Sequence, residues 1–530
     1  MTEKLVLYDA LLREGPQTQG INMSVKDKLR LAEVLDSLGL HYIEGGWPGA
    51  NPKDDLFFKE AKKLKLKNAK LSVFGMTRRA KLKAAQDPVL VNLVKAGVPT
   101  VTIFGKSWDF HVEYALKISL QQNLDLIYDS VKYLKSKVGE MFYDAEHFFD
   151  GYKANPEYAL KCLEAAFQAG ADCLVLCDTN GGSLPEDVEA VVTRVRQRFP
   201  EANLGIHCHN DGDLAVANSL VAVGAGVTQI QGCINGYGER CGNTNLTSMI
   251  PNLALKYKAS FIKPIHLEKL TEVSRVVDEV CNLHPKDNAS YVGKSAFAHK
   301  AGVHIAAVSK AAKTYEHIDP QLVGNHRNIL MSDQAGLAVV LHKAGKKNIK
   351  LNKDHSEARA VVETVKKMES EGYQFEGAEA SFELLLKKAL GQHRDFFDLV
   401  GFRVIVENRN DGPIISEATI KVKVNGVLEN TVGEGEGPIN ALDQALRKAL
   451  TKFYPSLKDV RLTDFKVRVL DAKEGTAAKV RVLIESQDAK DSWGTVGVSE
   501  NIIEASWEAL VDAIDYKLLK DSSTKGGKKK

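Results

Sequence analysis

The chain has 530 residues, of which 44% are hydrophobic and 26% charged, as in an ordinary globular protein. Its formal net charge of +3 comes from dispersed basic residues, and no apolar run approaches the length that spans a bilayer. We therefore expect two or three domains, small-molecule partners, and neither a nucleic-acid nor a membrane partner.

The cysteines indicate a reducing compartment. There are seven of them, an odd number, and none forms a C-x-x-C pair. Because they fall within predicted strands and helices of a large chain, buried thiols fit better than a disulfide framework. The chain enters its first predicted strand without a charged leader or an apolar signal segment. We expect a cytoplasmic protein.

Strand-like and helix-like stretches alternate from Lys4 to about Tyr257. The strand candidates are apolar and rich in β-branched or aromatic residues, as strands buried on both faces are. They are Lys4–Asp9, His41–Gly45, Lys70–Gly75, Thr100–Gly105, Glu140–Glu146, Cys173–Asp178, Asn203–His209 and Thr228–Ile234. Alternation of this kind over roughly 255 residues predicts an α/β fold, a (β/α)8 TIM barrel, which we assign to residues 1–262.

A doubly wound open sheet is the alternative to the barrel. It would usually have fewer strands and a Gly-rich first turn that binds phosphate. The first turn here reads L-L-R-E-G, at residues 11–15, and lacks that pattern. The barrel is therefore favoured, and its chemistry is expected at the carboxyl ends of the strands.

Two histidines lie near the end of the seventh predicted strand, in the stretch Leu204–Asp211. Side chains alternate along a strand, so His207 and His209 face one way and Cys208 the other. Two imidazoles on one face can bind one divalent ion, although such a pair can also simply cap a solvated strand end.

Polar residues follow most of the other predicted strands. They include Asp9, Arg13, Glu14, Glu44, Glu146, Asp178, Thr179, Glu239, Arg240 and Asn243. One charged residue at a strand end is usually a cap or a solvated charge, but such residues at most strand ends indicate a site. We expect Glu14 and Glu44 to orient the groups that contact the metal.

Asp9, His207 and His209 form the predicted set of metal ligands, to which Asn243 can add an amide oxygen. Mixed nitrogen and oxygen ligation suits Mn²⁺, Co²⁺ or Zn²⁺, whereas Mg²⁺ prefers more oxygen. Arg13 can stabilise an oxyanion that develops beside the metal. A metal beside an arginine suits a bound 2-oxo acid, so the residues predict a metal-dependent lyase, aldolase or condensing enzyme.

The rest of the chain divides into two further parts. Residues 263–394 are mostly helical in pattern, and we interpret them as an arm after the barrel. Residues 395–520 contain an internal repeat, because a shift of 64 positions aligns Val432-Gly433 with Val496-Gly497. Two strand-strand-strand-helix copies predict an α+β pseudo-repeat domain for ligand sensing or dimerisation. Residues 521–530 are predicted to be a disordered basic tail.

Several long motifs carry a family resemblance. D-A-L-L-R-E-G at 9–15, H-C-H-N-D at 207–211 and G-E-R-C-G-N at 238–243 resemble the 2-isopropylmalate, homocitrate and citramalate synthase family of metal-dependent barrel enzymes. D-A-E-H-F-F-D-G-Y-K at 144–153, L-C-D-T-N-G-G at 176–182 and Y-E-H-I-D-P-Q-L-V-G-N at 315–325 are most similar to the citramalate branch. The resemblance covers almost the whole chain, and the terminal repeat is similar to the family's regulatory domain.

The resemblance implies an acyltransferase that condenses acetyl-CoA with pyruvate to (R)-citramalate and CoA, in isoleucine biosynthesis. By matching position, Asp9, His207 and His209 would bind a divalent metal, with Asn243 in or near its coordination shell. Arg13 would stabilise the enolate and alkoxide oxygens, while Glu146 and Thr179 would hold the 2-oxo acid and the acetyl group.

The parts beyond the barrel have implied roles as well. His304 and Tyr315, in the arm, match the family positions associated with deprotonation of the acetyl methyl group. Without the resemblance, His304 would be interpreted as a surface histidine. The terminal domain would mediate a homodimer and bind an amino-acid feedback inhibitor, with isoleucine expected.

Other functions remain open at this stage. A 2-isopropylmalate or homocitrate synthase would differ in its 2-oxo acid, and spacing does not reveal the pocket lining. Trp47, Phe104 and Tyr143 are bulky enough to leave room for a methyl group only, or they are ordinary barrel packing. A metal-dependent acyl-CoA lyase would lack the arm and the repeat. The intact catalytic set disfavours a non-catalytic amino-acid sensor.

Overall fold

The computed structural model describes residues 4–330, 337–346, 356–408 and 413–526. The chain folds into two compact units, the first built from residues 1–297 and 318–327 and the second from residues 298–317 and 328–530. No helix among the described residues is long and apolar enough to cross a membrane.

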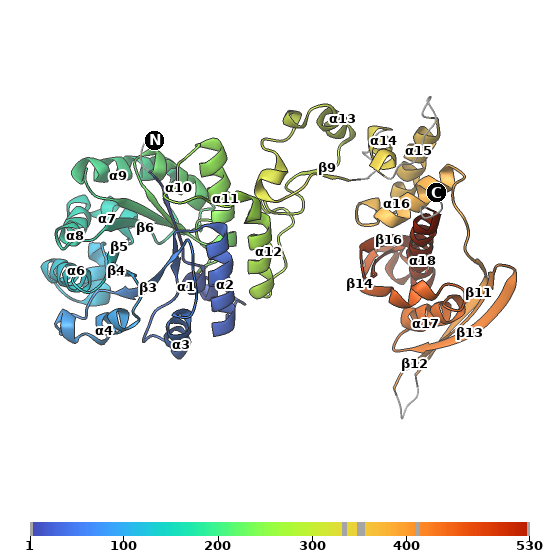
Figure 1. Ribbon diagram of the computed structural model, residues 1–530, viewed down its shortest axis with the longest axis horizontal. Helices are drawn as coiled ribbons and strands as arrows, with labels where there is room; N and C mark the ends of the chain where they lie inside the picture. The colour runs from blue at the N-terminus through green and yellow to red at the C-terminus, as the bar shows by residue number, and fades with distance from the viewer. Residues whose placement is uncertain (1–3, 331–336, 347–355, 409–412, 527–530) are drawn as a thin grey trace. The chain divides into compact units, whose positions relative to one another are not determined.

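The first unit is a closed barrel of parallel strands, which confirms the predicted fold (Figure 1). Its strands follow one another around the barrel, and the first pairs with the last between Val6 and Gln229 and between Asp9 and Gly232. They are β1 (Val6–Asp9), β2 (Tyr42–Glu44), β3 (Lys70–Met76), β4 (Thr100–Lys106), β5 (Glu140–Glu146), β6 (Cys173–Asp178), β7 (Leu204–Cys208) and β8 (Gln229–Gly232). The strands are mostly apolar because helices cover their outer face.

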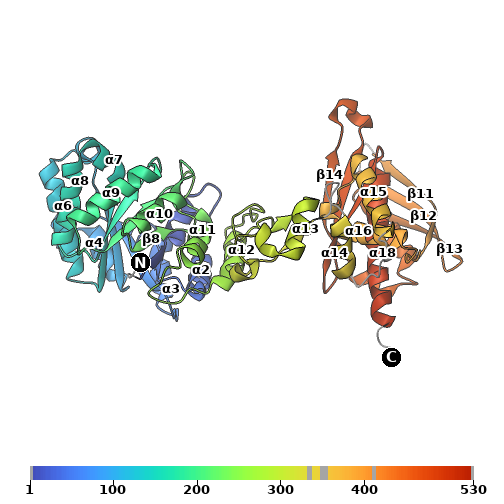
Figure 2. The same ribbon diagram turned by 90° about the horizontal axis from the view of Figure 1, so that it is seen from above.

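Helices surround the strands of the barrel (Figure 2). Helix α2 (Val25–Leu38) starts after Ser24, whose side chain accepts from the Asp27 N–H in a reciprocal capping box, and Gly39 caps its end with φ 94°. The other helices are α3 (Pro52–Ala61), α4 (Pro88–Lys95), α6 (Leu120–Lys135), α7 (Phe148–Ala154), α8 (Pro156–Gln168), α9 (Pro185–Arg198), α10 (Ala215–Gly224) and α11 (Leu246–Pro251).

The predicted arm, residues 263–394, is divided between the two units. Residues 263–297 and 318–327 belong to the barrel unit. Helix α12 (Leu270–Val280) belongs there because Leu270 and Val277 are buried in the barrel's apolar core. The sequence pattern predicted helices in this part of the chain but did not reveal which core each of them joins.

The described part of the second unit starts with two short strands and four helices. They are β9 (Ala298–His299), α13 (Gly302–Lys310), β10 (Asn328–Ile329), α14 (Leu337–Lys346), α15 (Ser356–Ser370) and α16 (Glu379–Ala389). Val361, Phe375 and Phe382 share one apolar core with Val496 and Val498 of the terminal domain. This shared core makes the helices and the terminal domain one compact unit.

The terminal domain confirms the predicted repeat. Two antiparallel three-stranded sheets are each followed by a helix. The first copy is β11 (Asp398–Glu407), β12 (Ile415–Val424), β13 (Val427–Gly435) and α17 (Pro438–Leu450), and the second is β14 (Arg461–Val469), β15 (Val480–Gln487), β16 (Ser492–Ser499) and α18 (Ile502–Gly526). Equivalent hydrogen bonds recur 64 positions apart, from Thr431 Oγ1 to the Ala445 carbonyl and from Thr495 Oγ1 to the Ala509 carbonyl, both at 2.8 Å.

The basic tail needs a partial correction. Residues 521–526, which we predicted to be disordered, continue helix α18 to Gly526. The helix extends because each added residue gains a backbone hydrogen bond, and because Lys517 Nζ lies 3.1 Å from Asp521 Oδ1 one turn further on. The last four residues of the predicted tail lie outside the described residues.

Candidate active site

A cavity of about 600 Å³ lies at the carboxyl ends of the barrel strands. Its size lies within the range of small-molecule sites. Its lining comes from most of the strands and includes Arg13, Glu14, Trp47, Phe74, Phe104, Asp144, Glu146, Cys177, Thr179, His207, His209 and Glu239. Polar residues that are far apart in the sequence meet here because parallel strands bring their carboxyl ends to one face.

Within the part of the chain that the structure describes, three buried side chains are grouped as a metal site requires. Ligand atoms of Glu14, His207 and His209 all lie within 4.8 Å of one another. The two imidazole centroids are 5.3 Å apart, because His207 lies in β7 and His209 follows directly after it. One carboxylate and two imidazoles form a common ligand set for divalent transition metals.

Unsatisfied polar atoms support this grouping. Glu14 Oε2, His209 Nδ1 and Asn243 Oδ1 are buried and have no hydrogen-bond partner among the described residues. Buried polar atoms are seldom left without a partner, because desolvation is then uncompensated. Asn243 also forms a β-bridge with His209. A divalent cation held by these residues would satisfy atoms that the protein itself leaves unpaired.

Asp9 has different partners from the ones expected. Its carboxylate oxygens accept hydrogen bonds from the backbone N–H groups of Leu11 and Ile234, both at 2.9 Å. Burial raises the pKa of Asp9 to about 7, although these two hydrogen bonds lower it. The side chain thus ties the end of β1 to the loop after β8. Glu14, rather than Asp9, is the carboxylate that the structure groups with His207 and His209.

The position of Glu14 shortly after β1 is the feature of the sequence that indicated a place near the site. The chain turns after β1 into the single helical turn α1 (Leu11–Glu14), so Arg13 and Glu14 both lie beside the cavity. We expected Glu14 only to orient the groups that bind the metal. The spacing alone did not show that this turn brings the side chain of Glu14 next to the two imidazoles.

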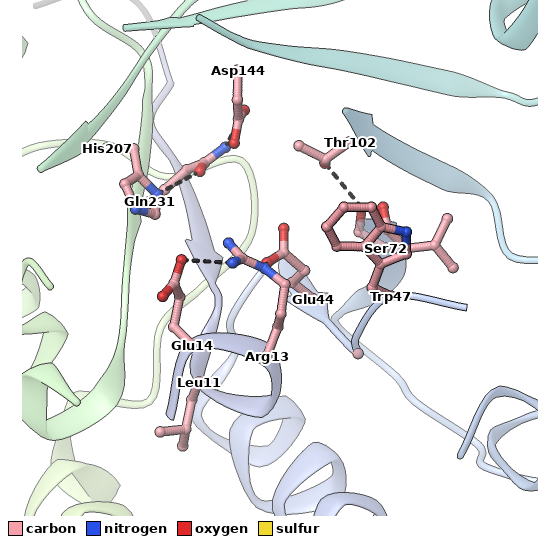
Figure 3. A network of polar contacts seen from close by, with 12 residues as sticks. Leu11, Arg13, Glu14, Glu44, Trp47, Ser72, Thr102, Asp144, His207 and Gln231 are labelled. Atoms are coloured by element: carbon pink, nitrogen blue, oxygen red, sulfur yellow. Dashed lines mark hydrogen bonds and ion pairs between the residues drawn. The ribbon is translucent and has the colours of Figure 1, made fainter. Parts of the chain in front are cut away.

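Arg13 is held by two carboxylates (Figure 3). Its Nη1 lies 2.7 Å from Glu14 Oε1, and its Nε donates to Glu44 Oε1. The guanidinium carbon lies 3.7 Å from the centroid of the Phe74 ring. Burial alone would lower the pKa of Arg13, but Glu14 and Glu44 raise it above its ordinary value. The guanidinium is therefore charged and fixed in orientation, as stabilisation of an oxyanion requires.

The protonation of two candidate ligands suits a cation. Burial and the neighbouring His207 lower the pKa of His209 to about 3, so its imidazole is neutral at neutral pH. Burial opposes ionisation of Glu14, but Arg13 and the two histidines lower the pKa of its carboxyl below the ordinary value. Neutral imidazoles and an ionised carboxylate are the forms that bind metals.

The predicted substrate-binding residues Glu146 and Thr179 also line the cavity. Glu146 forms an ion pair with Lys106. Thr179 Oγ1 accepts from the backbone N–H of His147 at 2.9 Å, so the Thr179 hydroxyl proton can be donated to a ligand. His147 has the left-handed backbone conformation, with φ 55°, which is unusual for a residue other than glycine.

Aromatic side chains form one wall of the cavity. Trp47 packs edge-on against Phe74 and Phe104 with centroid distances of 5.9 Å, and the two phenyl rings stack at 5.6 Å. Of the three bulky candidates from the sequence, Trp47 and Phe104 line the cavity. The third, Tyr143, is fully buried in the barrel core.

His304 and Tyr315 lie in the second unit, whereas the cavity belongs to the first. Their rings stack with a centroid distance of 4.0 Å and an interplanar angle of 26°. Both side chains are exposed, and 46% of Tyr315 is accessible to solvent. The structure therefore brings these two predicted residues together as an exposed pair.

Family profiles match three consecutive segments of the chain. Residues 4–277 match HMGL-like proteins, residues 291–373 match the homocitrate synthase post-HMGL domain-like family, and residues 376–518 match the LeuA allosteric (dimerisation) domain. The first match covers the barrel, and the last covers the terminal repeat.

Relatives match over nearly the full chain. An (R)-citramalate synthase of Geobacter sulfurreducens is 57% identical over 99% of both chains. One of Aquifex aeolicus is 56% identical over 98% of this chain and 99% of its own. A 2-isopropylmalate synthase of Clostridium kluyveri is 28% identical over 97% of both chains. The chain belongs to the (R)-citramalate synthase family.

Proposed function

We propose that the barrel cavity is the site at which this acyltransferase condenses acetyl-CoA with pyruvate to give (R)-citramalate and CoA. The observation that carries the proposal is the grouping of Glu14, His207 and His209 beside Arg13 within one cavity. The (R)-citramalate synthases that are 47–57% identical to this chain support the reaction, which serves isoleucine biosynthesis.

Glu14, His207 and His209 would hold the divalent metal, and Asn243 has a free amide oxygen to add. When bound, such a metal polarises the carbonyl group of a 2-oxo acid. Two imidazoles and one carboxylate favour Mn²⁺, Co²⁺ or Zn²⁺ over Mg²⁺, which prefers an oxygen-rich shell.

The remaining residues have separable tasks. Arg13 stabilises the negative charge that develops on the carbonyl oxygen of pyruvate during attack. Thr179 donates its hydroxyl proton to the bound substrate, and Glu146 helps to orient it. The aromatic wall next to Arg13 limits the room for the side chain of the 2-oxo acid.

The condensation needs a base for the acetyl methyl group. On the family resemblance, we assign this role to His304, whose ring stacks on that of Tyr315. The base takes a methyl proton, and the resulting carbon nucleophile forms a bond to the carbonyl carbon of pyruvate. The carbonyl oxygen then gains a proton, and water cleaves the thioester to release CoA.

The terminal domain supports feedback regulation, and we propose isoleucine as its ligand. A cavity of about 730 Å³ lies between α17 and β14. Apolar side chains of Ile439, Leu462 and Phe465 line it beside the charged Arg461. An amino acid with an aliphatic side chain needs both apolar contact and groups that bind its charged ends.

We also propose that this domain mediates a homodimer. The first sheet of the repeat exposes a group of large apolar side chains at between 40% and 61% of their surface, namely Leu399, Val400, Ile405, Val406, Val427, Leu428 and Val432. Exposed apolar surface of this kind marks an interaction site, and a second copy has the same surface to offer.

The seven free cysteines support our assignment to the cytoplasm.

Release of CoA from acetyl-CoA tests the proposal. The purified chain is assayed with pyruvate, 2-oxobutyrate, 2-oxoisovalerate and 2-oxoglutarate, with Mn²⁺ or with chelator. We expect the highest kcat/KM for pyruvate and loss of activity with chelator. Preference for 2-oxoisovalerate or 2-oxoglutarate would overturn the substrate assignment, and full activity with chelator would overturn the metal site.

A further inference from the structure

A buried chain of hydrogen bonds leads away from His207 (Figure 3). His207 Nδ1 lies 2.9 Å from Gln231 Oε1. The amide nitrogen of the same glutamine, Nε2, lies 3.3 Å from Asp144 Oδ1 and 3.2 Å from Gln229 Oε1. All four side chains are buried, and they come from strands β5, β7 and β8 of the barrel.

The two acceptors fix the orientation of the Gln231 amide. The oxygen and nitrogen of an amide are nearly equal in size, so their partners decide which atom faces which way. Gln231 Nε2 donates to Asp144 Oδ1 and to Gln229 Oε1. Its nitrogen therefore faces these two oxygens, and its oxygen faces His207.

The orientation of the amide in turn fixes the imidazole. A carbonyl oxygen 2.9 Å from His207 Nδ1 requires that this nitrogen carry the proton. In a neutral imidazole the other nitrogen, Nε2, then carries the lone pair. His209 differs, because its Nδ1 has no partner among the described residues.

We propose that Gln231 and Asp144 are positioning residues that hold His207 in the tautomer that binds the metal. The inference rests on the proposed metal site of Glu14, His207 and His209. Asp144 acts through Gln231, and Gln231 acts through the imidazole. A histidine ligand whose second nitrogen donates to a fixed acceptor is held in orientation and is more basic toward the metal.

Binding of Co²⁺ to the metal-free full-length protein tests the inference without reference to turnover. The visible absorption of bound Co²⁺ reports both affinity and ligand geometry. We expect Gln231→Leu to weaken Co²⁺ binding by about ten- to hundredfold and to alter the spectrum. Gln86→Leu is the control, because Gln86 is an exposed glutamine of the barrel unit that does not line the cavity. It is expected to bind Co²⁺ as the parent does.

Two variants of Asp144 separate positioning from packing. Asp144→Asn keeps an oxygen that can accept from Gln231, so the parent affinity and spectrum are expected. Asp144→Leu removes the acceptor, so weaker binding and an altered spectrum are expected. If the two variants behave alike, the inference is overturned. If Gln231→Leu does not fold, these two Asp144 variants still test the positioning role.

His207→Ala distinguishes the inference from the proposal on which it rests. Unchanged Co²⁺ binding in His207→Ala would place the metal elsewhere and overturn the proposed site. Lost binding in His207→Ala, together with parent-like binding in Gln231→Leu and Asp144→Leu, would keep the site and overturn the positioning role.

Discussion

Arg13 contacts the carboxylate of its own neighbour in sequence, with Nη1 2.7 Å from Glu14 Oε1. Adjacent residues of a helix do not ordinarily face each other, so both side chains turn toward the same point, the barrel cavity. Since Arg13 also bonds Glu44, one guanidinium is shared by two carboxyl groups. A site with more carboxylates than cations suits a divalent ion.

Replacement of Arg13 by lysine tests the oxyanion role. Arg13→Lys keeps the charge but loses the planar fork that contacts two carboxylates at once. We expect kcat for CoA release to fall by about 10²- to 10³-fold. Arg30→Lys, at an exposed ion pair with Glu279, is the control and should be indistinguishable from the parent. A kcat of Arg13→Lys close to that of the parent would contradict the role.

Asp9→Asn tests whether Asp9 is a structural anchor. Asparagine offers one acceptor oxygen where the backbone supplies two donors, so one N–H of the pair is left unsatisfied. We expect the free energy of unfolding to fall by about 1–3 kcal/mol, with metal affinity retained. Urea unfolding and metal titration check the two effects. Loss of metal without loss of stability would return Asp9 to the ligand set.

His41 predicts a dependence of stability on pH. Its Nδ1 accepts from the Leu7 N–H at 2.8 Å, and burial lowers its pKa to about 4. The unfolded chain therefore binds a proton below about pH 6.5 that the folded chain binds only near pH 4. The stabilisation is complete above the unfolded pKa and is lost as the pH falls.

From pH 7 to pH 5 this histidine should lower the free energy of unfolding by about 2 kcal/mol. His41→Asn keeps an acceptor but cannot titrate, so the variant should lose that part of the pH dependence in urea unfolding. His266→Asn, at an exposed histidine, is the control. An equal pH dependence in His41→Asn and the parent would refute this origin.

The cavity of the terminal domain predicts where the inhibitor binds. Phe465→Ala removes an apolar wall of that cavity. We expect the isoleucine concentration for half inhibition of CoA release to rise by about tenfold or more, because a buried phenyl group is worth about 1.5–3 kcal/mol. Val467→Ala, at an exposed position of the same strand, is the control. Unchanged inhibition in Phe465→Ala would place the inhibitor elsewhere.

The sequence predicted the elements whose cause is local. The barrel strands are mostly apolar because they are buried on both faces, and the ends of α2 follow from the capping chemistry of Ser24 and Gly39. The repeat was visible because the same contacts recur at a fixed spacing, as Thr431 and Thr495 show.

What could not be predicted depends on tertiary geometry. Asp9 ends β1 and Glu14 follows in α1, and only the turn of α1 shows that Glu14 lies within reach of the imidazoles. Gln231 is an uncharged residue within a strand, so nothing in the sequence marked it as the partner of His207. The role of His304 and Tyr315 was implied only by the family resemblance, because a single histidine in the sequence does not by itself indicate a catalytic function.

The most direct test of the proposed metal site is to measure the metal content and turnover of Glu14→Gln. Glutamine keeps the size of the side chain but removes the negative charge that a cation requires. We predict that metal affinity falls by about ten- to hundredfold or more and that CoA release with pyruvate falls with it, while Asp9→Asn still binds metal. A Glu14→Gln protein that binds metal and turns over like the parent would contradict the proposed metal site.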